Sequence, residues 1–413
     1  MKIKQDIIPD RSHTFSKAYH QYPAGISPLY AISAKGSKLL TDKGEYTDWS
    51  MGLGPVIKGY CFEDLNKHIN SILKKGIAYS LPSSYEFEIA NKLIETLEFG
   101  EQVRFARNGS DVTSAAVRLA RYITKKDKVI CNGYHGWQDW YIGSTSRNYG
   151  VPKQVSELTI KIDSFSIESL EVAFKNHNDI ACVIIEPMIG DEPDIDFLSQ
   201  ARNLCNKHQS LLIFDECWTG FRCLRTGAIG YTGVTPDLSC YAKALGNGVP
   251  VSAVVGNKKN MSGYEDVFFS FTHASDPIGL AAADFMIDYL GNNFYKDLTS
   301  KTKKIHKKIN NIFSQIEESQ YQLIATSYPG KIVLSAKDDN MMIKLKTFLQ
   351  KELLSENILF NMFLAISEDH TNEDINNFLK VLNSAVKKIN NKGFDIDKET
   401  KGQLVKPVFR AQK

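Results

Sequence analysis

Four nearly continuous apolar runs between residues 100 and 285 constrain the fold more than any other feature of this sequence. Each run is four to six residues long, and helical patterns separate one run from the next. Strands that are apolar on both faces, with helices between them, are typical of a largely parallel sheet that helices cover on both sides. The sequence therefore predicts a large α/β domain. The runs are "KVIC" (128–131), "ACVIIE" (181–186), "LLIFDE" (211–216) and "VSAVVG" (251–256).

The chain of 413 residues is long enough for a second domain. Its beginning is rich in turn formers, and "KLLTDKGEYTDW" predicts a hairpin that turns at Asp42–Gly44. After about residue 290, amphipathic helices alternate with short strands. We expect a large domain (61–290), a smaller α+β domain (291–413), and an N-terminal segment (1–60) that packs with the smaller domain.

The composition is that of an ordinary globular protein, and we expect it in the cytoplasm. The net charge of +3 comes from 50 Lys and Arg against 47 Asp and Glu, which gives no reason to expect nucleic acid or a membrane as partner. No apolar segment has the features of a signal peptide or the length of a membrane span. Seven cysteines without a CxxC pair favour reduced, mostly buried thiols and no metal site. The lysine-rich run at 301–311 predicts the solvated face of a helix.

Polar residues lie where three predicted strands end, which is where open α/β sheets bind ligands. Glu186 ends "ACVIIE", and Asp215 lies at the end of "LLIFDE". Asp215 is either a helix cap or a buried carboxylate that needs a cation, such as a protonated pyridine nitrogen. A third strand leads through Asn108–Ser110 into a helix, whose first N–H groups suit a phosphate, although a plain N-cap explains the same residues.

One lysine, Lys243, lies among small and apolar residues in "SCYAKALGNGVP". It is either a surface residue whose stem covers apolar groups or a placed amine. It follows Asp215 by one helix-and-strand unit, as expected if both side chains face one pocket. A lysine amine, a strand-end aspartate and a phosphate-binding turn together would form a pyridoxal 5'-phosphate (PLP) site.

In their order and spacing, these motifs resemble those of the class III aminotransferases of PLP fold type I, closest to the glutamate-1-semialdehyde aminomutase branch. The resemblance extends from about Tyr22 to about Ile389. It implies the fold type I architecture, PLP as cofactor, amino transfer between a donor amine and an aldehyde or ketone acceptor, and a homodimer. It rests on "YPAGISP", "RNGSDVTSAAVRLAR", "GYHGW", "IIEP", "LLIFDECWTGFR", "YAKALGNGVP" and "FTHASDP".

The resemblance also implies roles for individual residues. Lys243 would be the Schiff-base lysine, and Asp215 would pair with the pyridine nitrogen, so these two are the expected catalytic residues. Cys217 stands where the family usually has valine. The other cofactor-binding residues would be Gly109 and Ser110 at the phosphate, Tyr134 and Cys217 on the two faces of the ring, Glu186 near the cofactor, and Thr272 at the phosphate of the neighbouring subunit.

The substrate side departs from the aminomutase pattern. Aminomutases have "SPVRA", whose arginine binds the substrate carboxylate, whereas this chain has "SPLYA" with Tyr30 at that position. A tyrosine cannot make the bidentate charged contact of an arginine. We therefore expect an aminotransferase with another substrate, in a surface-glycan or secondary-metabolite pathway, and Tyr30 and Trp137 beside that substrate. Intramolecular transfer by an aminomutase-like enzyme is the alternative, and a cofactor-binding regulatory protein is a third possibility.

Several neighbouring residues have two interpretations. His135 is a structural histidine or a proton-transfer group, and Arg222 is a structural ion-pair residue or a substrate clamp. Trp137, Trp140 and Tyr141 belong to the core or to the wall of the substrate site.

Overall fold

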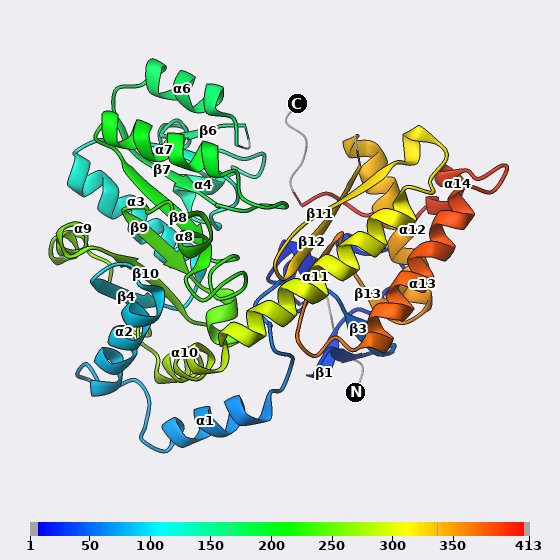
Figure 1. Cartoon of the computed structure of the whole chain (residues 1–413), viewed down its shortest axis with the longest axis horizontal. Coiled ribbons are helices and arrows are strands. Elements are labelled where there is room, and N and C mark those ends of the chain that lie inside the picture. Colours follow the sequence, from blue (N-terminus) through cyan, green and yellow to red (C-terminus); the bar gives the residue numbers. More distant parts are fainter. Residues whose placement is uncertain (1–6, 164, 337, 409–413) are drawn as a thin grey trace. The chain divides into compact units, whose positions relative to one another are not determined.

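The computed structural model describes residues 7–163, 165–336 and 338–408, which form two compact units (Figure 1). One unit comprises residues 63–296. The other comprises residues 7–62 together with 297–408. Each unit has its own sheets and helices.

A seven-stranded sheet forms the centre of the 63–296 unit, in the strand order β4-β10-β9-β8-β7-β5-β6. Neighbouring strands from β9 to β6 run parallel, whereas β10 runs antiparallel to both of its neighbours. The sheet is therefore largely parallel, as predicted, and the run "VSAVVG" supplies an antiparallel strand. The strands are β4 (Gln102–Ala106), β5 (Lys128–Asn132), β6 (Thr159–Lys161), β7 (Ile180–Ile185), β8 (Leu211–Glu216), β9 (Leu238–Tyr241) and β10 (Ser252–Gly256).

Helices cover both faces of this sheet. Successive side chains of a strand point to opposite faces, so each strand presents apolar side chains to the helices on both sides. On β7, Cys182 and Ile184 belong to an apolar cluster with α3, whereas Val183 and Ile185 belong to a second cluster with α6 and α7. Burial on both faces explains why the strands read as continuous apolar runs. The helices are α1 (Glu63–Leu73), α2 (Ser84–Leu97), α3 (Gly109–Thr124), α4 (Asp139–Ile142), α5 (Lys153–Ser156), α6 (Ile167–Asn176), α7 (Ile195–Lys207), α8 (Gly227–Thr232), α9 (Lys258–Met261) and α10 (Pro277–Tyr289).

The other unit contains two smaller sheets, in the orders β1-β2-β3-β13 and β11-β12-β14. The predicted hairpin is confirmed, since β2 and β3 pair antiparallel on either side of Asp42 and Lys43. The strands are β1 (Ala31–Lys35), β2 (Lys38–Thr41), β3 (Gly44–Asp48), β11 (Leu323–Tyr328), β12 (Lys331–Ala336), β13 (Ile358–Leu359) and β14 (Phe363–Ala365). The helices are α12 (Asp339–Ser355), α13 (Asn372–Ile389) and α14 (Ile396–Thr400), while α11 (Asn292–Phe313) begins in the 63–296 unit and continues into this one.

Three expectations about surface and core can be compared with the structure. The lysine-rich run lies on α11, and most of its lysines are exposed, as predicted. Six cysteines are buried and Cys61 is exposed, which agrees with mostly buried thiols. No helix within the described ranges is both long enough and apolar enough to cross a membrane.

Candidate active site

The carboxyl ends of four neighbouring parallel strands lie at one edge of the large sheet. β5, β7, β8 and β9 run in the same direction, so the residues that follow them meet at this edge. His135 follows β5, and Glu186 follows β7 directly. Asp215 is near the end of β8, and Lys243 lies just beyond β9. The fold thus brings together residues that are about 110 positions apart in the sequence.

Asp215 is a buried carboxylate whose partner is His135. Asp215 Oδ2 lies 2.8 Å from His135 Nδ1, and Oδ1 accepts the Cys217 N–H at 3.0 Å. Burial raises the pKa of Asp215, but the hydrogen bond and charge of His135, with smaller contributions from Cys217 and Lys243, bring it below its ordinary value. Asp215 is therefore ionised at neutral pH, so the strand end carries a buried negative charge.

His135 contacts Asp215, which favours the structural interpretation of this histidine over a proton-transfer role. Its Nε2 lies 3.1 Å from the Asn132 carbonyl oxygen, and its Nδ1 faces Asp215. A carbonyl oxygen and an ionised carboxylate both accept hydrogen bonds, so each ring nitrogen of His135 faces an acceptor. The ring is fully buried against Trp140, with 6.0 Å between the ring centroids. His135 is thus positioned to orient Asp215 and keep it ionised.

Lys243 occupies a strained backbone position. Its φ is 49°, in the left-handed region that residues with a side chain rarely adopt. Such strain costs on the order of 1–3 kcal/mol and persists where the surroundings fix it, often at functional sites. The Lys243 Nζ lies 4.8 Å from the centroid of the Trp218 ring. Because its charge also lowers the pKa of Asp215, amine and carboxylate belong to one cluster.

The turn before α3 presents two backbone N–H groups beside this cluster. Asn108 caps α3 and exchanges hydrogen bonds with Asp111. The next two N–H groups, of Gly109 and Ser110, have no acceptor within the part of the chain that the structure describes. A Cβ on Gly109 would lie 2.8 Å from the Cys217 Sγ, so this position requires glycine. The turn therefore adjoins the loop that follows Asp215.

Glu186 fixes the loop that carries Tyr134. Its Oε1 accepts the Tyr134 N–H at 2.6 Å. Gly133 has a φ of 107°, and a Cβ there would lie 2.7 Å from the same oxygen. The Tyr134 ring lies edge-on to Tyr141, 5.5 Å between centroids, and is half exposed. Glu186 thus acts on the site through the position of Tyr134.

Two residues expected at the substrate, Tyr30 and Trp137, have exposed side chains. Tyr30 belongs to the unit of residues 7–62 and 297–408, where it is exposed. Trp137 lies in the loop beyond Tyr134 and is 68% exposed. The neighbouring Trp140 and Tyr141 are buried, which favours the core interpretation for these two.

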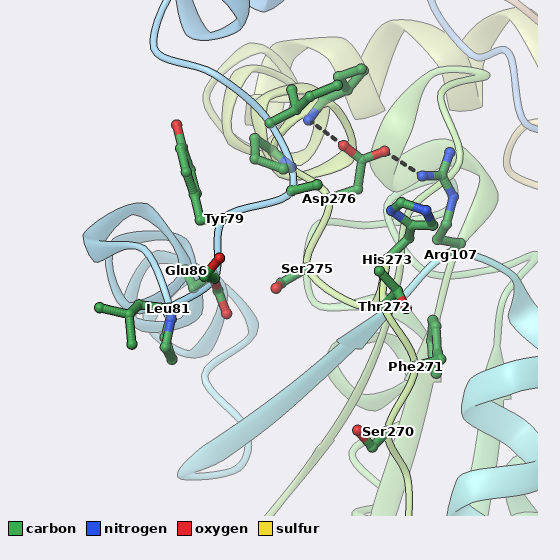
Figure 2. A pocket seen from close by; sticks show the side chains of 16 residues that line it. Tyr79, Leu81, Glu86, Arg107, Ser270, Phe271, Thr272, His273, Ser275 and Asp276 are labelled. Atoms are coloured by element: carbon green, nitrogen blue, oxygen red, sulfur yellow. Dashed lines mark hydrogen bonds and ion pairs between the residues drawn. The ribbon is translucent and has the colours of Figure 1, made fainter.

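Thr272 lines a separate hollow of about 640 Å³. The lining of this hollow contains none of the clustered residues (Figure 2). It consists of two segments, 77–82 and 270–278 without Ala274, together with Glu86 and Arg107. Lys243 does not line this hollow, so the hollow does not place Thr272 beside Lys243 of the same chain.

The sequence analysis did not identify Trp218 as a site residue, and it left the role of Arg222 undecided. The Trp218 side chain is buried, and two cations lie over its ring: the Lys243 Nζ at 4.8 Å and the Arg222 Cζ at 5.2 Å. Arg222 itself is fully buried. The available signal was the place of Trp218 in "DECWTGF", directly after the strand that carries Asp215.

Comparison with known protein families identifies the chain. The family described as "Aminotransferase class-III" matches residues 24–331. This chain belongs to the class III aminotransferases. It is a PLP-dependent transaminase, and the resemblance seen in its motifs is confirmed.

Curated relatives agree with this assignment, and solved structures share the fold. Glutamate-1-semialdehyde 2,1-aminomutase of Legionella pneumophila (strain Lens) is 31% identical over 357 residues, 81% of this chain and 82% of that protein. The 3-aminobutyryl-CoA aminotransferase of Cloacimonas acidaminovorans (strain Evry) is 31% identical over 386 residues, 90% and 92% of the two chains. The FumI protein of Sphingopyxis sp. MTA144, solved in its PLP internal aldimine form, has a TM-score of 0.83 at 22% identity, covering 92% and 93%. An omega-transaminase from Sphaerobacter thermophilus has a TM-score of 0.83 at 21% identity, covering 94% and 96%. The expected fold type I architecture is confirmed.

The cluster fits PLP, the cofactor of this transaminase. The ionised, buried carboxylate of Asp215 suits a protonated ring nitrogen, since a buried charge needs a partner of opposite sign. The amine of Lys243 suits an aldehyde. The unsatisfied N–H groups of Gly109 and Ser110 suit a phosphate.

Glu216, next to Asp215, is a fully buried acid that holds the loop after β8. Its carboxylate accepts hydrogen bonds from the Thr219 hydroxyl and, at 2.7 Å, from the Ala228 N–H. Gly227 has a φ of 61°, and a Cβ there would lie 2.7 Å from the Glu216 carboxylate oxygens. Burial raises the pKa of Glu216 to about 7, and its hydrogen bonds with Thr219 and Ala228 offset this only in part.

We expect Glu216→Gln to reduce the loss of stability between pH 4.5 and about 7. The folded protein holds the Glu216 proton up to about pH 7, whereas the unfolded chain releases it near its ordinary value of 4.5. The free energy of unfolding therefore falls as pH rises through this window, by about 3 kcal/mol from this group. Glutamine has no proton to lose, so thermal melting at several pH values should show the variant gaining on the wild type as pH rises. Parallel curves for the two proteins would contradict this.

Proposed function

We propose that this transaminase moves an amino group between a donor amine and an aldehyde or ketone acceptor, with Lys243 and Asp215 as its catalytic residues. The observation that carries this proposal is the cluster at the strand ends, where a lysine amine and an ionised buried carboxylate lie beside the turn before α3. The proposed cofactor-binding residues are Gly109, Ser110, Tyr134, Glu186, Asp215, Cys217, Lys243 and, across a dimer, Thr272 of the partner subunit.

Each catalytic residue has a defined task. When bound, PLP supplies an electron sink that stabilises negative charge on the substrate carbon. The Lys243 Nζ would act as general base and then general acid, moving a proton between the substrate carbon and the cofactor carbon, and the second half of the reaction would reverse this transfer. Asp215 holds a proton on the ring nitrogen by its charge. His135 orients Asp215 through its Nδ1.

A second copy of the chain would complete the site. Thr272 lines a hollow whose lining contains neither Lys243 nor Asp215. The family resemblance implies that Thr272 binds the phosphate of the cofactor in the neighbouring subunit. Large apolar side chains are exposed on, or directly before, the two segments that line this hollow, and exposed apolar patches mark interaction surfaces. Both observations support a homodimer with shared active sites. The exposed side chains are Ile77, Tyr79, Leu81, Phe268 and Phe271.

Mixing Lys243→Ala subunits with Thr272→Ala subunits tests the shared site. In a mixed dimer, one site carries both lesions and the other carries neither. We expect verified mixed dimers, separated by two affinity tags, to regain about half of the wild-type activity, since one of two sites is intact. Verified mixed dimers that remain as inactive as the parents would contradict the sharing of sites.

Tyr30 carries the proposal about substrate. An arginine holds a carboxylate by charge-assisted hydrogen bonds of about 1.5–3 kcal/mol each, whereas a phenol offers one neutral donor. We expect glutamate-1-semialdehyde to be a poor substrate, with kcat/KM lower by about tenfold to a hundredfold than in a dedicated aminomutase. Steady-state assays measure this directly. A kcat/KM equal to that of an aminomutase would show that the substrate site has been misread.

The same residue favours an acceptor that carries hydroxyl groups. A tyrosine stacks on and hydrogen-bonds a sugar-like or amino-alcohol precursor, and Trp137 would add a second aromatic surface. We therefore propose a role in surface-glycan or secondary-metabolite synthesis.

The aminomutase relatives favour the alternative, in which the amino group moves within one molecule. The relative named 3-aminobutyryl-CoA aminotransferase favours transfer between two molecules. Purified protein incubated with single amines separates the two, because the cofactor absorbance changes in the first half-reaction. Release of a keto product from a separate donor marks an aminotransferase. Absence of any half-reaction across a panel of amines would contradict both and revive a regulatory role.

A further inference from the structure

The residues around Thr272, from 268 to 276, are exposed or only partly buried. Phe268, which leads into it, is 78% exposed, and Phe271 is exposed as well. Residues 270–273 form a loop without hydrogen bonds of a helix or strand. A loop with so little burial needs other anchors if it is to present one hydroxyl group at a defined place.

Two arginines of the neighbouring strand and helix anchor the near side of this segment. Arg118 of α3 donates from Nη1 to the Phe268 carbonyl at 2.9 Å. Arg104 of β4 donates from Nη2 to the Phe269 carbonyl at 2.6 Å. Its guanidinium also lies 5.6 Å from the Tyr264 ring centroid and 5.9 Å from that of Phe269. Hydrogen bonds from charged donors are about twice as strong as neutral ones.

A third arginine anchors the far side. Arg107, which follows β4, forms an ion pair with Asp276, and both residues line the hollow together with Thr272 (Figure 2). The other carboxylate oxygen of Asp276 accepts the Ile278 N–H at 3.1 Å and so caps α10. Asp276 is therefore fixed to the helix behind it and to Arg107 beside it. Thr272 lies between the two anchored ends.

We propose that Arg104, Arg107 and Arg118 are positioning residues for Thr272, and that they act on the active site of the partner subunit rather than on their own. This inference rests on the shared site proposed above. Arg107 precedes the phosphate-binding turn of its own chain by two residues, so a cis role is the competing explanation. We call these three residues the arginine clamp. A mutation in the clamp should weaken the active site of the partner subunit, whereas a cis role predicts that it weakens the active site of its own subunit.

The test measures PLP affinity of full-length protein by titration of the cofactor-free form. We expect homodimeric Arg107→Ala to bind PLP at least about tenfold more weakly, because one charge-assisted anchor of Thr272 is lost. Arg107→Lys should restore part of the affinity. Arg121→Ala is the control, since Arg121 lies on α3 like Arg118 but donates to the Asp127 carbonyl, and it should bind PLP as the wild type does.

Mixed dimers show whether Arg107 affects the active site of its own subunit or that of the partner subunit. When Arg107→Ala subunits pair with Lys243→Ala subunits, the one site with an intact lysine receives Thr272 from a subunit with an intact clamp. We expect wild-type PLP affinity at that site, read from borohydride-fixed label on Lys243. Weak binding there would place Arg107 in cis and overturn the proposal, as would unchanged affinity in homodimeric Arg107→Ala.

Two further variants keep the outcome decisive. If Arg107→Ala does not fold, Asp276→Asn keeps an acceptor for the cap of α10 while it removes the ion pair, and the same two results are expected. Thr272→Ala paired with Lys243→Ala checks the shared site itself. If Thr272→Ala shows the trans effect and the arginine variants do not, the clamp is wrong and the shared site stands. If Thr272→Ala shows no trans effect either, the shared site is wrong.

Discussion

Lys243→Ala should abolish turnover while the folded protein still binds PLP without a covalent bond. In the proposed mechanism, Lys243 supplies both the amine that attaches the cofactor and the group that moves the substrate proton, and its charge acts on the pKa of Asp215. General acid–base catalysis alone contributes about 10²–10⁴-fold, and the loss of covalent attachment adds to this. We expect activity at or below about one thousandth of wild type.

Borohydride reduction followed by peptide mapping checks the assignment independently of activity. In the wild type, the label should appear on Lys243 alone, and in Lys243→Ala it should disappear. Lys259→Ala, which removes an exposed lysine beyond β10, is the control and should keep both label and turnover. A label on any lysine other than Lys243 would overturn the assignment.

Asp215→Asn should lose most of the activity with the fold intact. The neutral amide cannot hold a proton on the ring nitrogen, so negative charge on the substrate carbon is less stabilised. Removal of a preorganised electrostatic group typically costs about 10²–10³-fold in rate, and we expect a loss of this order. His135 would then face an amide in place of the carboxylate 2.8 Å away, which adds to the effect.

Single-turnover rates separate this chemical effect from weaker cofactor binding, when they are measured at saturating PLP. Asp237→Asn is the control, because Asp237 precedes β9 at the opposite end of the strand and pairs with Arg202. Its rate per folded molecule should match the wild type. Near wild-type single-turnover rates in Asp215→Asn would refute the electrostatic role.

The large sheet was predictable because strands buried on both faces leave continuous apolar runs. Cys182 and Val183 illustrate the reason, since these neighbours on β7 enter different apolar clusters. The direction of β10 was not predictable, because an apolar run such as "VSAVVG" has the same pattern in a parallel and in an antiparallel strand. Strand direction depends on the connections, and these depend on long-range packing.

The site was predictable only where sequence neighbours define it. Asp215 lies at the end of an apolar run, and Lys243 lies alone among small residues, so both stand out in the sequence. The pairing of His135 with Asp215 joins residues 80 positions apart, and only the fold brings them together. Trp218 escaped notice for the same reason, because its contact with Lys243 forms in space rather than along the chain.

The distribution of thiols has a practical consequence for the mixing experiments. Of the seven cysteines, which all fall within the described residues, only Cys61 is exposed. A maleimide dye would therefore react there and leave Cys217 and the other buried thiols unmodified. Donor and acceptor dyes on separate batches of subunits would report partner exchange by energy transfer in real time. The wild-type chain thus already has a single-site fluorescent handle without any engineered cysteine.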